Sequence, residues 1–477
     1  MVKSRKSKKR QKRKGKGSRK IPARPRKINA STVYDTCSEQ ISPFGGLLAL
    51  IKFLDLIQFR EIFDLAYRAP SRKPLLGHYK MVTGLLMLLF IGFSRIWHFS
   101  YLQLDAMLCG FFKLSRLPVA STFWRYVNSL GINQANALVG LMTLMRKRVW
   151  QICHLSYGRV CVDIDTTVET LFGNQQGGRK GHNTQHRGKK AYRPVLCFIQ
   201  QSREYLSGHL RRGETISGKE TAALIGRIKG CLPACVQEVL VRADGEFLSW
   251  PSVKACHEQG LDFIIANKGC TPVFDSAGWY QPKKRQPYQY NSCIYQPGGW
   301  EKPCRFVAMR IPKDIKISNK RVQLPLFEDD RYTYRVFCTS IGRKAHKVIR
   351  EYDKRADVES LIGESKREGL EAIPSSRFKN NYAYFQIVML AYNIWRYMKI
   401  LAQGSNPPSE DHPLAGIESN TIRIARLRLL MISAKVVKDS NRDKVRYSIQ
   451  DSRTPGLFAF LKYLDLKRAQ PKCWATG

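Results

Sequence analysis

The segment Arg159-Val-Cys-Val-Asp-Ile-Asp-Thr-Thr-Val-Glu169 carries the clearest strand pattern of this chain. Branched apolar residues alternate with carboxylates in it. This period of two predicts a β-strand that carries Asp163 and Asp165 on one face and apolar side chains on the other. Carboxylates on a mainly apolar strand are costly to leave unpaired, and a divalent cation often compensates for them. Ordinary turn or cap aspartates are the alternative for this pattern.

Further strands and a helix follow this first strand. Ser217-Gly-Lys-Glu220 is a capping box, which predicts that a helix begins there and runs through Ile228. Asp244 ends an apolar run just before Gly245, where the chain can leave a sheet. Three successive strands followed by alternating helices and strands predict an α/β fold with a mixed sheet. The predicted strands are residues 159–169, 193–201, 205–211, 238–244 and 261–266.

The flanking segments differ from this core. Residues 42–130 have a helical apolar pattern and predict a small all-α domain, whereas residues 269–330 are rich in Pro, Gly, Tyr and Trp and predict an all-β insertion. A strand at 332–339, helices at 344–367 and 382–400, and a hairpin around 439–443 complete the pattern. The predicted division is a disordered basic arm (1–34), a helical DNA-binding domain (35–150), an α/β core in two parts (151–268 and 331–405), the β-rich insertion (269–330), and a C-terminal region with hairpin and helix (406–477).

The charge balance indicates a polyanionic partner. The 477 residues include 81 Lys and Arg against 37 Asp and Glu, a net charge of +44, which is typical of nucleic-acid-binding proteins. Residues 1–27 contain basic residues and no acidic ones, and such a segment cannot bury a core. Similar runs also occur in nuclear localisation signals and ribosomal-RNA-binding tails. The candidate DNA contacts in this arm are Lys8, Lys9, Arg10, Lys12, Arg13 and Lys14.

Several other classes of protein are disfavoured. The apolar runs are too short to cross a bilayer, and no apolar signal-peptide segment follows the basic N-terminus, so no membrane partner is expected. Thirteen cysteines without a Cys-x-x-Cys pair predict reduced thiols in a cytoplasmic protein. Residues 213–220 approach a phosphate-binding P-loop but end in Glu220. His182 and His186 have zinc-ligand spacing without a nearby third ligand, so a phosphate- or DNA-contacting loop is favoured there.

A third region with conspicuous charge is the predicted helix over residues 351–366. At 100° per residue, Tyr352, Arg355, Glu359 and Lys366 share one narrow face, and Glu364 lies on the opposite side. An exposed helix with many salt bridges is the alternative, but its charges would not need to share one stripe with a tyrosine.

The spacing Tyr352-x2-Arg355-x3-Glu359-x6-Lys366 resembles the Tyr-Arg-Glu-Lys signature of bacterial insertion-sequence DDE transposases at all four positions. Residues 162–167 and 241–247 resemble the first and second aspartate motifs of that family and occur in the expected order. Residues 177–194 are similar to the subgroup called transposase DDE domain, group 1. The resemblance covers residues 42–450.

The resemblance implies a ribonuclease H-like catalytic core in which Asp165, Asp244 and Glu359 form a metal-binding catalytic triad for two Mg²⁺ ions, with Mn²⁺ as a substitute. Asp163 competes with Asp165, which is favoured because it precedes Thr166-Thr167 as the family aspartate does.

The resemblance also implies roles in DNA binding. Tyr352, Arg355 and Lys366 would bind the DNA backbone at the cleavage site. Trp300, which follows two glycines, would stack on a displaced base, or it would pack the core of the insertion.

The expected function is therefore that of a transposase. It would bind the terminal inverted repeats of its element, cleave the DNA ends and join them to target DNA. Its partners would be double-stranded DNA and, in the DNA complex, a second copy of the chain, in the cytoplasm at the bacterial nucleoid. A non-catalytic DNA-binding protein derived from a transposase and a metal-dependent nuclease without strand joining remain as alternatives.

Overall fold

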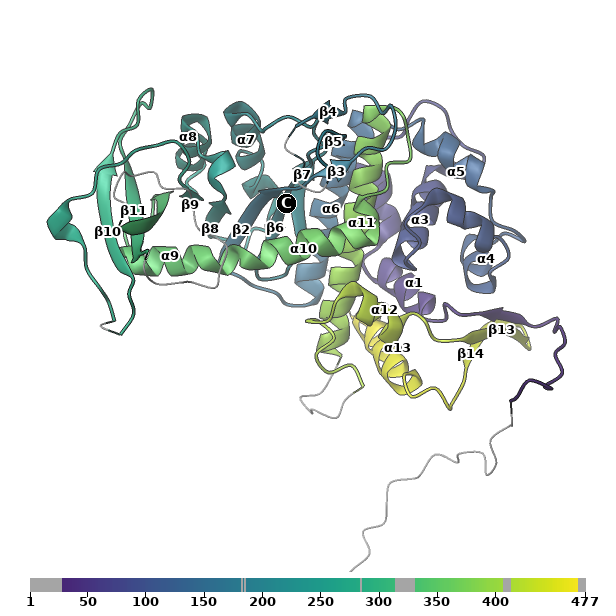
Figure 1. The fold of residues 1–477 in the computed structure, drawn as a ribbon. Helices are drawn as coiled ribbons and strands as arrows, with labels where there is room; N and C mark the ends of the chain where they lie inside the picture. Colours follow the sequence, from purple (N-terminus) through teal and green to yellow (C-terminus); the bar gives the residue numbers. More distant parts are fainter. Residues whose placement is uncertain are drawn as a thin grey trace, which may run out of the picture.

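The computed structural model describes residues 28–181, 183, 186–283, 285–313, 331–405 and 413–470. The candidate residues of the basic arm, and His182, lie outside these ranges. A mixed eight-stranded sheet has the strand order β10-β11-β12-β9-β8-β2-β6-β7 (Figure 1). Its strands are β2 (Arg159–Thr166), β6 (Val195–Ile199), β7 (Tyr205–His209), β8 (Glu238–Ala243), β9 (Asp262–Ala266), β10 (Gln289–Tyr295), β11 (Cys304–Pro312) and β12 (Tyr332–Thr339).

The strand β2 lies inside the sheet, as its alternating pattern predicts. It pairs antiparallel with β6 and parallel with β8, and β8 pairs parallel with β9. Strand β7 adds to β6 in the antiparallel sense. The predicted mixed α/β fold is therefore confirmed.

The predicted β-rich insertion (269–330) contains β10 and β11, which extend the central sheet beyond β12, a strand of the predicted second part of the core. Strand β12 pairs with β9, β11 with β12, and β10 with β11, all antiparallel. An open edge at β9 would leave a row of backbone donors and acceptors unpaired, and pairing with β12 provides partners for them. Figure 1 shows β10 and β11 at the end of the molecule opposite the helical bundle.

Helices cover the two faces of the sheet. Val162 packs on the face with Leu224 and Val253 of α7 (Gly218–Ile225) and α8 (Trp250–Glu258). Cys161 packs on the other face with Val348 of α9 (Ala345–Asp353). Since side chains alternate along a strand, Asp163 and Asp165 point to the same face as Cys161.

The N-terminus of α7 confirms the predicted capping box. The Ser217 hydroxyl accepts a bond from the Glu220 backbone N–H at 3.2 Å, and the Glu220 carboxylate accepts from the Ser217 N–H at 2.9 Å. The helix ends at Ile225, three residues before the predicted end. Glu220 also pairs with Arg211 at 3.1 Å, so this segment is a helix cap and not a phosphate-binding loop.

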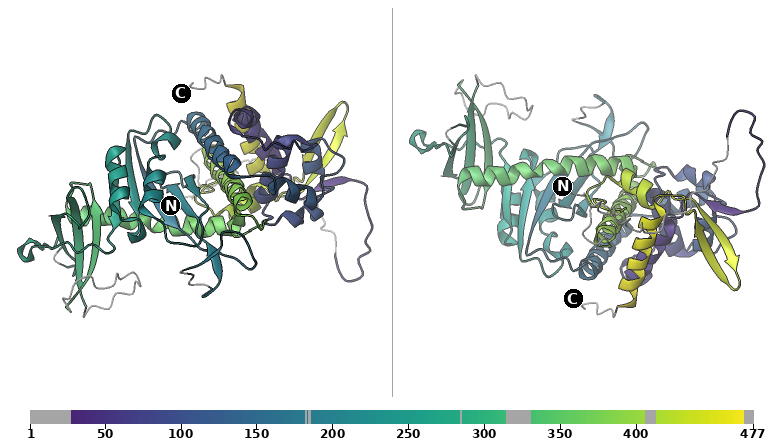
Figure 2. Two further views of the ribbon diagram at one scale, coloured as in Figure 1. Left: turned by 90° about the horizontal axis from the view of Figure 1, so that it is seen from above. Right: turned by 90° about the horizontal axis from the view of Figure 1, so that it is seen from below.

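The predicted helix over residues 344–367 is interrupted. A 3₁₀ turn (Lys354–Ala356) separates α9 from α10 (Asp357–Ser365), and a π-helical turn (Lys366–Leu370) follows. Gly369 in that turn has a φ of 119°, a backbone conformation that residues other than glycine rarely adopt. Both views in Figure 2 show α9 and α10 as one nearly continuous rod along the sheet.

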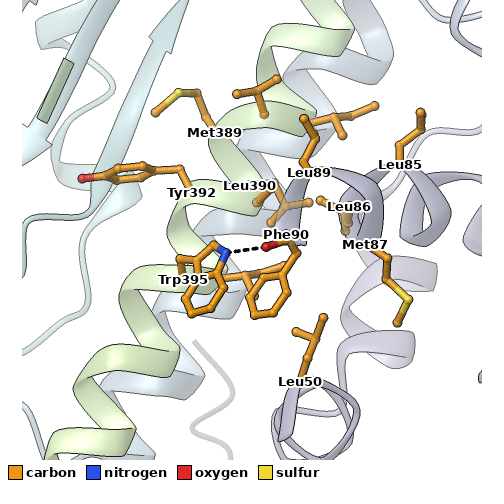
Figure 3. Packing of buried hydrophobic residues seen from close by; sticks show 14 of the residues in the cluster. Leu50, Leu85, Leu86, Met87, Leu89, Phe90, Met389, Leu390, Tyr392 and Trp395 are labelled. Atoms are coloured by element: carbon orange, nitrogen blue, oxygen red, sulfur yellow. Dashed lines mark hydrogen bonds between the residues drawn. The ribbon is translucent and has the colours of Figure 1, made fainter. Parts of the chain in front are cut away.

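The N-terminal helices share one apolar core with helices from the end of the chain. Figure 3 shows this packing between α3 and α11, where Phe90 and Trp395 stack with ring centres 4.1 Å apart. The Trp395 Nε1–H donates to the Phe90 carbonyl oxygen at 3.0 Å. The core therefore crosses the expected boundary at residue 150. Its helices are α1 (Leu47–Leu56), α2 (Phe59–Ala66), α3 (Gly77–Phe90), α4 (Ala106–Phe112), α5 (Ala120–Val127), α6 (Ile132–Ile152), α10, α11 (Phe378–Gly404), α12 (Ile422–Leu429) and α13 (Thr454–Ala469).

Two small three-stranded sheets complete the fold. The predicted hairpin is confirmed as β13 (Ala434–Asp439) and β14 (Arg442–Tyr447), and β1 (Gln40–Ser42) pairs with β13. The other sheet contains β3 (Glu169–Thr170), β5 (Lys190–Tyr192) and β4 (Arg179–Lys180). In the part of the chain that the structure describes, no helix combines the length and apolarity needed to span a bilayer.

Candidate active site

Two carboxylates meet at the ends of the parallel strands β2 and β8. The register pairs Ile164 with Ala243, and the next residues along the two strands are Asp165 and Asp244. The Asp165 Oδ1 accepts the Thr166 N–H at 2.8 Å. The Asp244 Oδ1 accepts the Glu246 N–H at 3.0 Å, which caps a short 3₁₀ turn (Gly245–Phe247). The chain leaves the sheet at this point, so both carboxylates lie at the C-terminal ends of two interior strands.

The guanidinium of Arg355 lies against this pair from the turn between α9 and α10. Its Nη2 is 3.1 Å from the Asp165 Oδ2 and donates to the Ile164 carbonyl oxygen at 2.9 Å. Burial raises the pKa of Asp165 to about 6, the positive charge of Arg355 opposes that rise, and the charges of Asp244 and Glu359 add to it. Burial also raises the pKa of Asp244, against the effect of Arg355. The carboxylates and the arginine thus form one electrostatic cluster.

Tyr352 and Glu359 flank Arg355 in the sequence, and each interacts electrostatically with the cluster. Glu359 is on α10 and exposed, and its charge acts on Asp165. The Tyr352 ring packs against Phe337 of β12 with ring centres 4.5 Å apart. Burial raises the pKa of the Tyr352 hydroxyl, and the charges of Arg355, Asp244 and Asp165 also act on it.

Lys366 lies apart from the other signature residues. Its Nζ donates to the Val168 carbonyl oxygen at 2.8 Å and lies 3.8 Å from the Glu371 carboxylate. Beside it, neither carboxylate oxygen of the buried Glu169 has a hydrogen-bond partner. Burial raises the pKa of Glu169 to about 8, although the charge of Lys366 lowers it. Lys366 therefore faces the segment that follows β2, whereas Tyr352 and Arg355 face the end of β2 itself.

Asp163 forms a buried ion pair with Arg242. Only 2 % of it is exposed, and it accepts two hydrogen bonds from the fully buried guanidinium of Arg242, at 2.7 and 2.8 Å. Arg242 also donates to the Glu351 carbonyl oxygen at 2.7 Å. This arrangement favours Asp165 over Asp163 as the first catalytic carboxylate.

Trp300 packs on the opposite face of the sheet. Its ring lies 5.6 Å from that of Trp250 in α8 and 6.4 Å from that of Phe306 in β11. These contacts belong to the apolar cluster around Val162, whereas Asp165 points to the other face. The geometry favours the packing alternative for Trp300.

Arg193 and Glu246 connect the ends of β2 and β8, and their pairing has no signal in the sequence. Arg193 donates to the Glu246 carboxylate at 2.8 Å and to the Thr166 hydroxyl at 3.2 Å. The Thr166 hydroxyl also donates to Glu246 at 3.2 Å. These bonds connect the residue after Asp165 with the turn that Asp244 caps. Glu246 is two residues from Asp244, which is a local signal, but the sequence does not indicate its partner Arg193.

The donor set of this site suits a hard divalent cation. Carboxylate oxygens are the ligands that Mg²⁺ prefers, and a cation would offset the like charges that raise the pKa of Asp165. Within the described ranges, no three His, Cys, Asp or Glu side chains already converge on a common point, and Arg355 provides the positive charge beside Asp165. The His186 ring lies close to the Phe172 ring. Among the described residues, no group of three His, Cys, Asp or Glu side chains that could hold zinc includes His186.

The family model described as transposase DDE domain group 1 matches residues 26–466. Among solved structures, the chain is similar to a piggyBac transposase seen by cryo-EM in a synaptic complex with hairpin DNA. That match has 12 % sequence identity, covers 80 % of each chain and has a TM-score of 0.41. No curated protein matches the chain.

Proposed function

The chain belongs to the transposase DDE domain group 1 family, and from that premise we propose that it is an active transposase. It binds the terminal inverted repeats of an insertion sequence, cleaves the DNA ends and joins them to target DNA by metal-dependent phosphoryl transfer. The observation that carries this proposal is the position of Asp165 and Asp244 at adjacent ends of parallel strands, beside Arg355. The five-strand unit β7-β6-β2-β8-β9 supports the ribonuclease H-like core that the sequence resemblance implies.

Asp165, Asp244 and Glu359 would hold the metal ions. When bound, two Mg²⁺ or Mn²⁺ ions would activate water or a 3′-hydroxyl and stabilise the leaving oxygen. Burial and the charges of Asp244 and Glu359 raise the pKa of Asp165 to about 6. A bound cation would offset these charges and favour the ionised carboxylate. Asp163 remains with Arg242 and does not take part.

The basic residues would place the DNA strand. Arg355 holds Asp165 in position and presents a fork of N–H groups that suits a phosphate. Tyr352 and Lys366 would contact the backbone on either side of it. The arm of residues 1–27 would add phosphate contacts without reading base sequence. A homodimer would bring two DNA ends together.

A strand-joining assay tests this function. The full chain is incubated with Mg²⁺ and DNA that carries its coding sequence with the natural flanks, together with a supercoiled target plasmid. We expect cleavage at the flanks followed by covalent joining of the 3′ ends to the plasmid. Cleavage without joining would identify a nuclease, and specific binding without cleavage would identify a non-catalytic DNA-binding protein.

A further inference from the structure

A basic cavity opens beside the proposed catalytic helix. It has a volume of about 420 Å³ and lies between α10, α11, the β6–β7 turn and the residues that precede α12. Glu359 and Ser360 form part of its wall, so it adjoins the candidate active site. The cations that line it are Arg203, Arg367, Arg396 and Lys399, and the carboxylates are Glu359 and Glu364.

Two of these cations are buried without a carboxylate partner. Arg396 and Lys399 are each 1 % exposed. Arg396 donates only to carbonyl oxygens, to that of Ser202 at 3.0 and 3.2 Å and to that of Glu418 at 3.1 Å. Lys399 donates to the carbonyl oxygen of Asn420. Within the described part of the chain, neither side chain has an ion-pair partner.

Other buried arginines in this protein are paired. Arg146 has Glu204 at 2.8 Å, and Arg242 has Asp163 at 2.7 Å. Burying a cation without a counter-charge is costly, so such a group is usually paired or binds a ligand. The nearest acid in the cavity, Glu364, already accepts the Ile422 N–H at 2.6 Å at the start of α12.

The rim of the cavity adds two further positive charges. Arg203 is half-buried and Arg367 is exposed, and neither side chain has an ion-pair partner among the described residues. Arg203 has a φ of 56°, which is uncommon for a residue other than glycine or asparagine. Burial lowers the pKa of Lys399 to about 7, and the charges of Arg396 and Arg203 lower it further, whereas the charges of Glu364 and Glu418 partly oppose the shift. An anion in the cavity would relieve this repulsion.

We propose that this cavity binds a phosphate group through Arg203, Arg367, Arg396 and Lys399. Guanidinium groups bind phosphate oxygens in a bidentate manner, and an ammonium adds a point charge. The phosphate belongs either to the backbone of a DNA strand that passes Glu359 or to a free phosphate anion. The site does not depend on the proposed transposase activity.

Thermal unfolding of the full chain tests the site. In sodium phosphate, the unfolding midpoint should exceed that in sodium chloride of equal ionic strength by at least about 2 °C. The cavity variant Arg203→Gln with Arg367→Gln should lose this difference, because it removes two rim cations and leaves the buried ones in place. The control variant Arg343→Gln with Arg423→Gln removes two exposed arginines outside the cavity and should keep it. No difference in the wild type, or an equal difference in the cavity variant, would overturn the proposal.

Binding of a short DNA duplex at constant ionic strength distinguishes the two sources of phosphate. If DNA is the source, inorganic phosphate should compete with the duplex for the wild type, and the cavity variant should bind the duplex more weakly than the control variant. Equal duplex affinity in both variants, together with the phosphate-specific midpoint shift, would identify a free anion as the ligand. Neither result decides whether the protein joins DNA strands, which the strand-joining assay tests separately.

Discussion

The guanidinium of Arg355 lies 3.1 Å from the carboxylate of Asp165 and donates to the backbone of the same strand through the Ile164 carbonyl oxygen. The two residues are far apart in the sequence, yet the arginine reaches the strand end from the turn between α9 and α10. We propose that Arg355 has two roles: it orients Asp165, and it would provide a phosphate contact.

Replacing this arginine should slow cleavage and change its pH dependence. Arg355→Gln removes the charge that lowers the pKa of Asp165, so the pKa rises above about 6 and more of the carboxyl is protonated at a given pH. Because metal binding needs the ionised form, the midpoint of the rate profile should move to higher pH. Loss of one such electrostatic contact costs about 100-fold in rate. Single-turnover cleavage rates measured across pH check both effects.

Arg350→Gln is the matched control, since Arg350 is exposed on the preceding helix. It should leave the rate profile in place. An Arg355→Gln profile that keeps the wild-type midpoint would show that Arg355 does not act through Asp165.

The buried pair of Asp163 and Arg242 should be needed for stability and not for catalysis. Asp163→Asn leaves the Arg242 charge buried and should lower the free energy of unfolding by about 3 to 5 kcal/mol. The double variant Asp163→Leu with Arg242→Met removes both charges and should recover most of that loss. Denaturant unfolding measures the three values. Metal-dependent cleavage by the double variant is expected, and its complete loss in a stable variant would return Asp163 to the list of metal ligands.

Glu169 should make the protein less stable as the pH rises. Its pKa in the folded protein is about 8, above its ordinary value of 4.5. Stability linked to this raised pKa is fully present below the unfolded pKa and is lost as the pH rises through the folded one. Glu169→Gln removes the titration, so it should be more stable than the wild type at pH 8.5 by roughly 4 to 5 kcal/mol and should differ little near pH 4.5.

Urea unfolding at several pH values checks this difference. Glu258→Gln, at an exposed acid on α8, should keep the wild-type slope of stability against pH. If Glu169→Gln has the same slope as the wild type, Glu169 is already ionised in the folded protein.

The local features of the fold could be predicted from the sequence, because each depends on neighbouring residues. The alternation around Asp163 and Asp165, the capping box at Ser217 and the hairpin at 434–447 are of this kind. The sheet extension by β10 to β12 could not, since a β pattern does not say which open edge it will join. For the same reason, an apolar helix pattern did not indicate that α3 would pack against α11.

The candidate site likewise combines residues that the sequence indicates with partners that it does not. The sequence places Asp165 and Asp244 at strand ends, and the parallel register then brings them together. Arg242 could not be identified as the partner of Asp163, because 79 positions separate them and only the register of β2 and β8 joins them. The 3₁₀ turn between α9 and α10 likewise lies within a segment whose pattern reads as one helix.

Trp300 should contribute to packing and not to DNA processing. Trp300→Ala removes contacts with Trp250 and Phe306 and should cost about 2 to 4 kcal/mol of folding free energy, since the ring is only partly buried. Supplying the DNA end already unpaired should not change the relative cleavage rate of this variant. Trp97→Ala, at an exposed ring, is the control and should be nearly neutral. A stable Trp300→Ala protein that is rescued by unpaired ends would instead establish base stacking.

Catalysis by the three carboxylates is best tested by single-turnover cleavage by a preassembled complex of the full chain with its flanking DNA, started by adding Mg²⁺. Asp165→Asn, Asp244→Asn and Glu359→Gln should each bind the DNA nearly as well as the wild type and lose cleavage by at least about 1,000-fold, because each removes an ionised metal ligand. Glu364→Gln should cleave at close to the wild-type rate, since the Gln carbonyl oxygen can still accept the Ile422 N–H. Full cleavage in excess EDTA, or wild-type cleavage by any of the three variants, would contradict the account.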